Sequence, residues 1–187
     1  MSTAASEPKE MWLNWLAITT IIMSASATLG SSKSAGFTSG AMMAQNKASD
    51  QWAFYQAKSI KQHSFELQKD ILQVQLAQAP AATSAKFVEK LNAYDANIER
   101  YTKERKEVKA DAERFEHERD LSQKNGKLFG TSIIYLQIGI TLSALAALLK
   151  KKPVWWLSLV VGAAGMLYFL NGFYYAYKGV TILVGMP

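Results

Sequence analysis

The sequence predicts an all-α membrane protein in which three transmembrane helices carry a long antiparallel helical hairpin between the first and the second. Three apolar blocks, at residues 11–30, 128–149 and 154–176, are each close to the ~20 residues that cross a bilayer. None of the blocks contains Asp, Glu, Lys, Arg or His. The stretch between the first two blocks is polar, and a seven-residue hydrophobic repeat in it is typical of a coiled coil.

The first apolar block, residues 11–30, follows a short N-terminal tail at residues 1–10. The small residues at 25–27 fit a signal-peptidase site, so residues 1–27 are either a cleaved signal peptide or part of a retained anchor. The tail has two glutamates against one lysine, and the apolar run is longer than the 7–15 residues of a signal peptide. Both observations favour a retained transmembrane helix.

Residues 31–40 are rich in Gly and Ser, which predicts a loop or hinge. A helix is expected from about Ala41 to Gln78. Its seam keeps four-three spacing at Ile60, Ser64, Leu67, Ile71 and Val74, and the same register runs back through Ala57, Ala53, Asp50, Asn46 and Met43. A second stripe is formed by Phe54, Phe65, Leu72 and Leu76. Two apolar faces predict that this helix contacts more than its hairpin partner.

A turn is expected near residues 79–84, because Pro80 cannot continue a helix and Thr83 or Ser84 offers an N-cap for the next one. A short connection makes the two helices antiparallel neighbours, so residues 41–127 form the extramembrane hairpin. The seam of the second arm repeats at Phe87, Leu91, Tyr94, Ile98, Tyr101, Arg105, Val108, Ala112 and Phe115.

The loop at residues 150–153 sets the expected orientation, because Lys150–Lys152 make it short and strongly basic. The positive-inside rule places this loop and the N-terminus in the cytoplasm and the hairpin in the periplasm. Residues 177–187 then form a C-terminal tail. Four basic residues flank the membrane on the opposite side and argue the other way, although long loops count less in this rule: Lys33, Arg119, Lys124 and Lys127.

Arg105 is a charge on the predicted seam, where a dry contact makes a charge costly. One interpretation is that its stem packs while the guanidinium reaches a carboxylate, such as Glu104 or Asp111 or one on the other arm. The other is that Arg105 fixes register or the choice of partner, as polar seam residues do in coiled coils.

Asp50, Trp52 and Tyr55 are further candidate interaction residues. Trp52 and Tyr55 are three apart and share a helix face. They either pack the hairpin, with Asp50 paired to an arginine such as Arg114, or form a recognition patch for a partner, since Trp and Tyr are common interface anchors.

The apolar blocks carry small residues at helical spacing, which lets helices approach closely in lipid. The candidate packing residues are Gly139, Ser143, Ala147, Ser158, Gly162 and Asn171, with Thr20, Ser24 and Thr28 as a further series and Asn14 and Gln137 as possible hydrogen-bonding residues. These faces serve either the packing of the three spans or contacts with other subunits.

No pattern in the sequence indicates catalysis, a cofactor or a metal site. The chain has no Cys, and the residues three before His63 and His117 are Ile60 and Arg114, so the Glu-x-x-His motif of di-metal bundles is absent. Residues 31–127 hold sixteen Lys and Arg against thirteen Asp and Glu, a balance that argues against nucleic-acid binding. The apolar blocks have no ionisable side chain except tyrosine, which argues against an ion pathway.

The segment SDQWAFYQAKSIK at residues 49–61, together with the three-span layout, resembles an uncharacterised bacterial family, domain of unknown function 4337. The resemblance implies a bacterial inner-membrane location and carries no established activity. The expected function is a non-enzymatic membrane protein that contacts lipid and self-assembles or scaffolds through its coiled coil as a homo-oligomer. The first alternative is an accessory subunit of a larger inner-membrane enzyme complex. A small transporter or sensor is the less favoured alternative.

Overall fold

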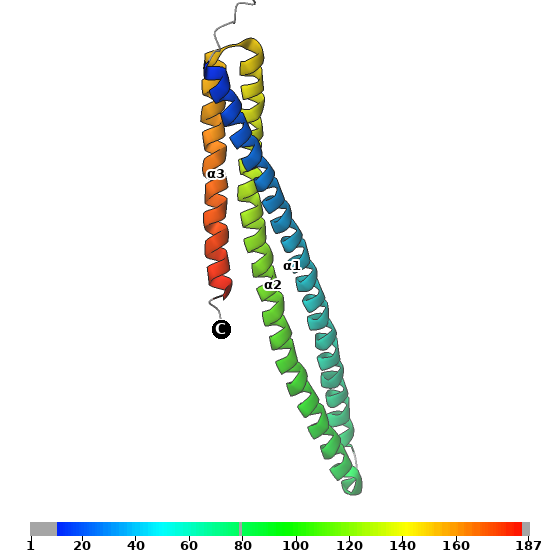
Figure 1. Ribbon diagram of the computed structural model, residues 1–187. Coiled ribbons are helices and arrows are strands. Elements are labelled where there is room, and N and C mark those ends of the chain that lie inside the picture. The colour runs from blue at the N-terminus through cyan, green and yellow to red at the C-terminus, as the bar shows by residue number, and fades with distance from the viewer. Residues whose placement is uncertain (1–10, 79, 185–187) are drawn as a thin grey trace, which may run out of the picture. The chain divides into compact units, whose positions relative to one another are not determined.

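The computed structural model describes residues 11–78 and 80–184, and the regular secondary structure of these residues is entirely helical. The helices are α1 (Met11–Ala77), α2 (Ala81–Leu149) and α3 (Lys152–Val184) (Figure 1). Each contains a stretch that is long and apolar enough to span a membrane. The predicted all-α class with three apolar helices is therefore confirmed, while the N-terminal tail at 1–10 lies outside the described residues.

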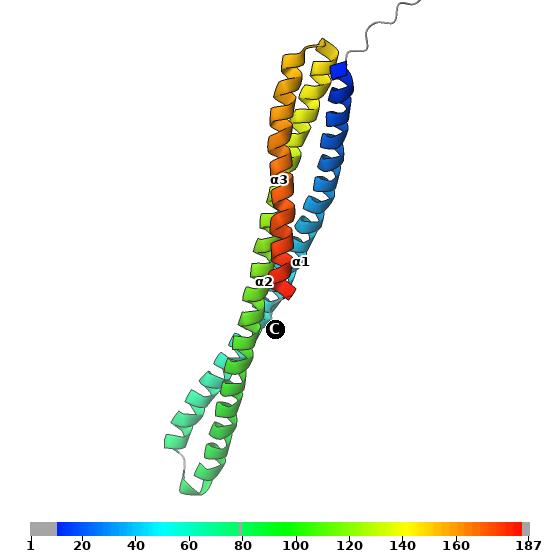
Figure 2. The ribbon, with the colours of Figure 1, turned by 60° about the vertical axis from the view of Figure 1, so that its left-hand side comes forward.

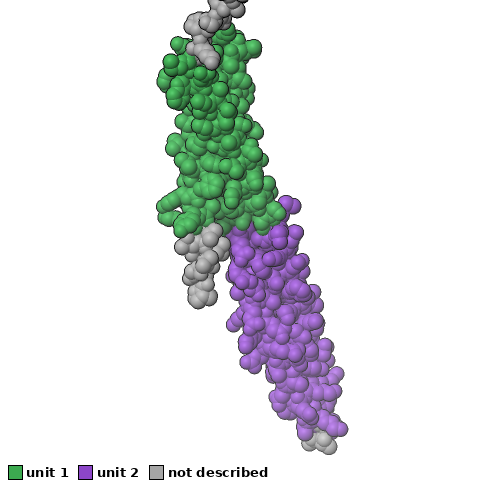
Figure 3. Space-filling model, viewed as in Figure 1, with its two compact units in different colours: residues 1–41, 120–187 green, residues 42–119 purple. Residues whose placement is uncertain are grey.

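The chain divides into two units, which Figure 3 colours separately. The apolar unit consists of residues 1–41 and 120–187, and it contains the three apolar helical stretches. The polar unit consists of residues 42–119 and contains the charged parts of α1 and α2.

The Gly- and Ser-rich residues 31–40 are helical, where composition favours a loop. The Ser34 hydroxyl donates to the backbone oxygen of Gly126 at 3.2 Å, and the Thr38 hydroxyl donates to the backbone oxygen of Ser34 at 2.9 Å. The ring of Phe37 stacks on that of Phe129, with 5.8 Å between centroids. Small residues let α2 come close to α1 here, and this packing outweighs the weak helix propensity of Gly and Ser.

The basic connection between α2 and α3 is a tight turn at Lys150 and Lys151. The backbone N–H of Lys151 donates to Ala146, and that of Lys150 donates to Ala147. These two bonds form a Schellman motif, which requires a left-handed residue after the last helical turn. Lys150 adopts that conformation with φ of 48°, at a position where glycine is the usual residue.

Two other predicted boundaries differ in the structure. Helix α2 begins directly after Pro80, so residues 81–84 of the expected turn are helical, while residue 79 lies outside the described part. Helix α3 continues to Val184, so most of the predicted C-terminal tail is also helical, and residues 185–187 lie beyond the description. Local signals such as proline locate a break well but do not determine how far the flanking helices extend.

In the apolar unit, residues 11–40 of α1, residues 120–149 of α2 and α3 lie side by side (Figures 1 and 2). Met23, Ala27 and Leu136 form its buried core, with Ile140 packed against them. Phe129 is fully buried and meets the edges of two rings of α3, those of Phe169 and Phe173.

In the polar unit, the α1 and α2 arms lie alongside each other (Figures 1 and 2), and side-chain contacts pair their residues in reverse order along the sequence. These contacts run from Gln45 with Arg119, through Lys58 with Glu104, to Lys69 with Asp95. This reverse order is the pattern of antiparallel neighbours.

Candidate interaction surfaces

The face of α1 that contacts α2 in the polar unit is called the inner stripe. Its residues alternate three and four apart and are all buried or half-buried: Ala44, Ala48, Gln51, Tyr55, Lys58, Gln62, Phe65, Lys69, Leu72 and Leu76. It includes three members of the expected second apolar stripe, while the fourth, Phe54, is 58% exposed. Four of its ten residues are Gln or Lys, so the inner stripe mixes polar and apolar side chains on one helix face.

The seam predicted for α1 lies on the opposite, exposed face, so that prediction was wrong. Ile60 is 67% exposed, Leu67 64%, Ile71 58% and Val74 62%. Ser64, between them, is also exposed. These five residues are called the outer stripe. The residues that continue its register toward Met43 are exposed as well.

The reason for this error is that both stripes of α1 repeat every seven residues, and apolar content alone favours the outer one. The inner stripe is selected by fit to α2. The Phe65 ring lies 5.8 Å from the rings of both Tyr94 and Tyr101, stacked on the second. Lys58 and Lys69 are mostly buried along their side chains, and their ammonium groups reach the carboxylates of Glu104 and Asp95 on α2.

On α2, the nine residues of the predicted repeat are buried or half-buried in the structure. The list comprises Phe87, Leu91, Tyr94, Ile98, Tyr101, Arg105, Val108, Ala112 and Phe115. Ala112 is fully buried, and its small side chain leaves room for close packing of α1 on this face. One face of α2 is therefore fully used against α1.

Arg105 lies on this face and reaches neutral groups of α1 instead of the expected carboxylates. Its Nη2 donates to the Tyr55 hydroxyl at 2.7 Å and its Nη1 donates to Gln62 Oε1 at 2.9 Å. The guanidinium also lies over the Tyr55 ring, 4.7 Å from its centroid. The Nε atom is buried without a hydrogen-bond partner. Arg105 thus links two residues of the inner stripe, Tyr55 and Gln62, that lie about two helical turns apart.

The carboxylates expected beside Arg105 have other partners. Glu104 forms an ion pair with Lys58 of α1, and the hydrogen bond from this ammonium lowers the pKa of the Glu104 carboxyl. Asp111 pairs with Arg114 at 3.0 Å within α2. Arg114 is therefore not the partner of Asp50, which is exposed.

Trp52 and Tyr55 contact each other and α2. The Trp52 indole N–H donates to Glu116 Oε1 at 3.0 Å, and its ring meets that of Tyr55 edge-on at 5.5 Å. Both side chains are half-buried. The structure thus brings Trp52, Tyr55 and Arg105 together in one polar-aromatic cluster and leaves Asp50 outside it.

In the apolar unit, Gly139 and Gly162 allow α2 and α3 to cross closely. A Cβ added at Gly139 would lie 3.3 Å from the Cα of Gly162. Ser143 is fully buried and its hydroxyl hydrogen-bonds to that of Thr20 on α1. Ser158 is also fully buried. These four of the expected packing residues lie inside the unit.

The other two expected packing residues, Ala147 and Asn171, are not buried inside the apolar unit. Ala147 is exposed while its neighbour Ala146 is fully buried, and Asn171 is exposed. Gly165 and Gly172 were not among the predicted packing residues. A Cβ at Gly165 would lie 2.9 Å from the backbone nitrogen of Leu136. A seven-residue small-residue spacing from Ser158 through Gly165 to Gly172 is the signal that would have revealed them.

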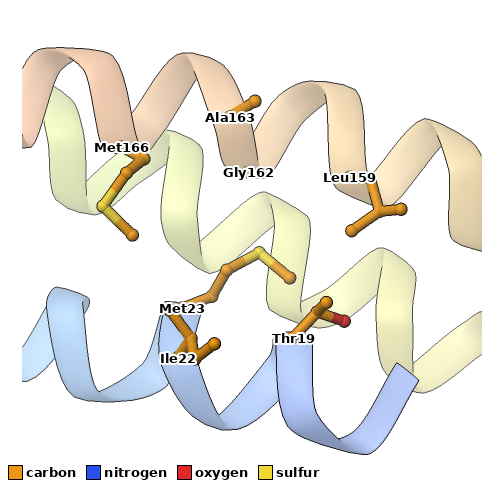
Figure 4. A pocket seen from close by; sticks show the side chains of 7 residues that line it. All are labelled: Thr19, Ile22, Met23, Leu159, Gly162, Ala163 and Met166. Atoms are coloured by element: carbon orange, nitrogen blue, oxygen red, sulfur yellow. The ribbon is translucent and has the colours of Figure 1, made fainter. Parts of the chain in front are cut away.

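An apolar groove of about 200 Å³ lies between α1 and α3 in the apolar unit. Figure 4 shows its lining side chains, with Met23 extending from α1 toward Gly162. The lining residues are Thr19, Ile22, Met23, Leu159, Gly162, Ala163 and Met166. One hydroxyl among six apolar residues does not provide the converging polar groups of a cofactor site.

Across the described part of the chain, no three His, Asp or Glu side chains gather in a way that would hold a metal ion. His63 contacts Glu66 at 2.7 Å, one turn along α1. The hydrogen bonds from Gln62 and His63 lower the pKa of the Glu66 carboxyl. This arrangement is a local surface pair.

By their length and composition, the three apolar helices indicate a multi-pass membrane protein. The family comparison is more specific. The model of the family described as Domain of unknown function (DUF4337) matches residues 12–175, and the chain belongs to this family. No curated protein and no solved structure matches the chain.

Proposed function

We propose that the chain is a non-enzymatic protein of the bacterial inner membrane that acts by protein–protein interaction. Its polar unit serves as an antiparallel coiled-coil hairpin that self-assembles or scaffolds another complex. The observation that carries this proposal is the outer stripe. Four large aliphatic side chains on one helix face are each more than half exposed, and the other large exposed hydrophobic residues described in the polar unit, Met42, Met43, Phe54 and Val88, lie outside this stripe.

The outer stripe supports an interaction role because the fold of the polar unit does not depend on it. The inner stripe already supplies the contacts of α1 with α2, including those with Tyr94 and Tyr101. Contiguous exposed apolar patches on stable proteins usually mark interaction sites. A helix that is apolar on two faces is expected to have two neighbours.

The orientation that we propose has the N-terminus and the Lys150–Lys152 loop in the cytoplasm and the polar unit in the periplasm. The loop supports it because three lysines occupy a turn of minimal length, and short basic loops are retained inside. Lys33 and Lys124, which carry charge at the other side, lie over the rings of Phe173 and Tyr175.

An accessory subunit of a larger inner-membrane enzyme complex is the second candidate. The apolar groove between α1 and α3 favours it, because a groove lined by Ile22, Leu159 and Met166 suits a helix of another membrane protein.

Native mass spectrometry of the protein extracted gently from its own membranes tests the proposal. A species at a whole multiple of 20.7 kDa supports self-assembly, and stoichiometric additional masses support the accessory role. A monomer without partners in every mild detergent would contradict both forms of the interaction proposal.

A further inference from the structure

We propose that the outer stripe is a homodimer interface, in which α1 of one chain packs in parallel and in register on α1 of a second copy. This inference rests on the proposed function and specifies its surface and its partner. The outer stripe consists of Ile60, Ser64, Leu67, Ile71 and Val74, as defined above.

The spacing of the outer stripe fits a helical partner. Its residues alternate four and three apart over two heptads, which keeps a single seam facing a second helix. Ser64 is the only polar member, and its hydroxyl donates to the backbone oxygen of Ile60 at 2.9 Å. Because this hydroxyl is already satisfied within α1, Ser64 enters an apolar seam without leaving an unpaired polar group.

The parallel direction follows from the membrane anchor. Every copy is held by the same three apolar helices, so all copies have one orientation across the bilayer. A two-fold axis along the membrane normal brings each residue of the outer stripe opposite its own counterpart. Anchoring also raises the effective concentration of one arm near another, so that a seam of two heptads suffices.

Among the described side chains of the polar unit, the outer stripe is the one set of large exposed hydrophobic residues at heptad spacing that a second copy offers, since Met42, Met43 and Phe54 lie before it on α1. On the α2 arm, within the described side chains at 84–119, the one large exposed hydrophobic residue is Val88, at 46%. The other exposed residues of this arm are polar or charged residues and alanines. A pairing of α1 with α1 is therefore the arrangement that covers the aliphatic side chains of both copies.

The flanks of the stripe accept this parallel pairing. In a parallel coiled coil, a residue on one flank faces the residue five positions later on the other chain. His63 then faces Gln68, and Asp70 faces Gln75. No like charges meet beside the four aliphatic residues.

Asp50 sets the limit of the seam. It lies in the same register, is exposed, and would face the Asp50 of the second copy. Two carboxylates directly opposite one another repel. The dimer seam is therefore confined to the residues after Ala57, and Asp50 opposes its extension toward Met43.

Disulfide trapping in native membranes tests this inference, because the full chain has no cysteine of its own. Leu67→Cys places a thiol on the outer stripe. Gln73→Cys is the matched control, since Gln73 is also exposed on α1 but lies well away from the stripe on the helix circumference. Mild oxidation is expected to give a covalent dimer of Leu67→Cys and essentially none of Gln73→Cys.

A second pair of variants measures the non-covalent dimer by native mass spectrometry. Leu67→Glu with Ile71→Glu is expected to convert the dimer to monomer, while helix content by circular dichroism stays unchanged because the inner stripe is untouched. Gln73→Glu is expected to keep the dimer.

These experiments distinguish a failure of the dimer inference from a failure of the proposed interaction function. Equal crosslinking at both positions indicates random collision and overturns the inference. A wild-type oligomer that survives Leu67→Glu with Ile71→Glu, or a foreign protein that is released by that variant, also overturns it while the proposed interaction function stands. A wild-type chain that is monomeric and unpartnered overturns the inference and the proposed function together.

Discussion

Arg105 offers the sharpest quantitative test of the polar unit. Substitution by Ala removes both the apolar stem and the guanidinium, whereas substitution by Met removes the guanidinium and keeps an apolar stem, so the two variants measure these contributions separately. Arg105→Ala removes the hydrogen bonds to Tyr55 and Gln62 and the contact with the Tyr55 ring. Hydrogen bonds of a charged group contribute roughly 1.5–3 kcal/mol each and an exposed cation–π contact about 0.5–1 kcal/mol. Arg105, Tyr55 and Gln62 are all half-buried, so water compensates for much of the lost interaction energy. The expected net decrease in the free energy of unfolding is about 2 kcal/mol.

Arg105→Met is expected to cost about 1 kcal/mol or less. It keeps the apolar stem on the seam and eliminates the buried Nε that lacks a hydrogen-bond partner. Replacing a poorly compensated buried charge by an apolar side chain of similar volume is often neutral or stabilising. Arg105→Lys keeps the charge but cannot reach both oxygens with a planar fork, so its cost should fall between those of Met and Ala.

Thermal unfolding of the full chain in detergent, followed by circular dichroism, measures these differences. For a chain of this size, about 2 kcal/mol corresponds to a midpoint lowered by roughly 4–8 °C. An unchanged midpoint for Arg105→Ala would show that the polar-aromatic cluster does not contribute to stability. Equal losses for Arg105→Ala and Arg105→Met would refute the division into a packed stem and a costly head.

Three further predictions concern packing, pH and orientation. Gly165→Ala should lower the thermal midpoint, since overpacking against backbone costs about 1–3 kcal/mol of stability. Gly36→Ala has nothing within 4 Å of the added Cβ, so it should raise the midpoint through a gain of up to ~1 kcal/mol in helix propensity. Equal effects of the two substitutions would contradict the packing of α3. Because the pKa of Glu104 is lowered in the folded chain, its stabilisation is present above the ordinary carboxyl range and lost as pH falls through the folded pKa. The wild-type midpoint should therefore fall more steeply below about pH 5 than that of Glu104→Gln, and parallel curves would disprove the ion pair. In intact cells an impermeant maleimide should label Lys106→Cys and spare Lys151→Cys, and the reverse pattern would invert the proposed orientation.

The sequence was sufficient to predict the helical class, the three apolar stretches and the packed face of α2. The α2 repeat is unambiguous because large apolar side chains recur at heptad spacing on only one face between Phe87 and Phe115, and Val88 is the one large hydrophobic residue exposed outside it in the described arm. The helical state of residues 31–40 was not predictable from propensity, because it depends on the hydrogen bond from Ser34 to Gly126 and on the stacking of Phe37 on Phe129. Such contacts join residues about ninety positions apart in the chain.

The face of α1 could not be chosen from hydrophobicity, and the reason bears on function. A helix in a lone two-helix hairpin is expected to bury its most apolar stripe. Helix α1 instead packs Tyr55, Gln62 and Phe65 against α2, and leaves Ile60 and Leu67 exposed. The inner stripe is specific, because its aromatic rings, amides and lysines match named groups of α2. The outer stripe has no such features and fits any apolar helix at the right spacing. A chain that uses its specific contacts internally and leaves an apolar stripe exposed fits the association that we propose, in which the proposed membrane anchor would supply the orientation and proximity that the outer stripe itself does not encode.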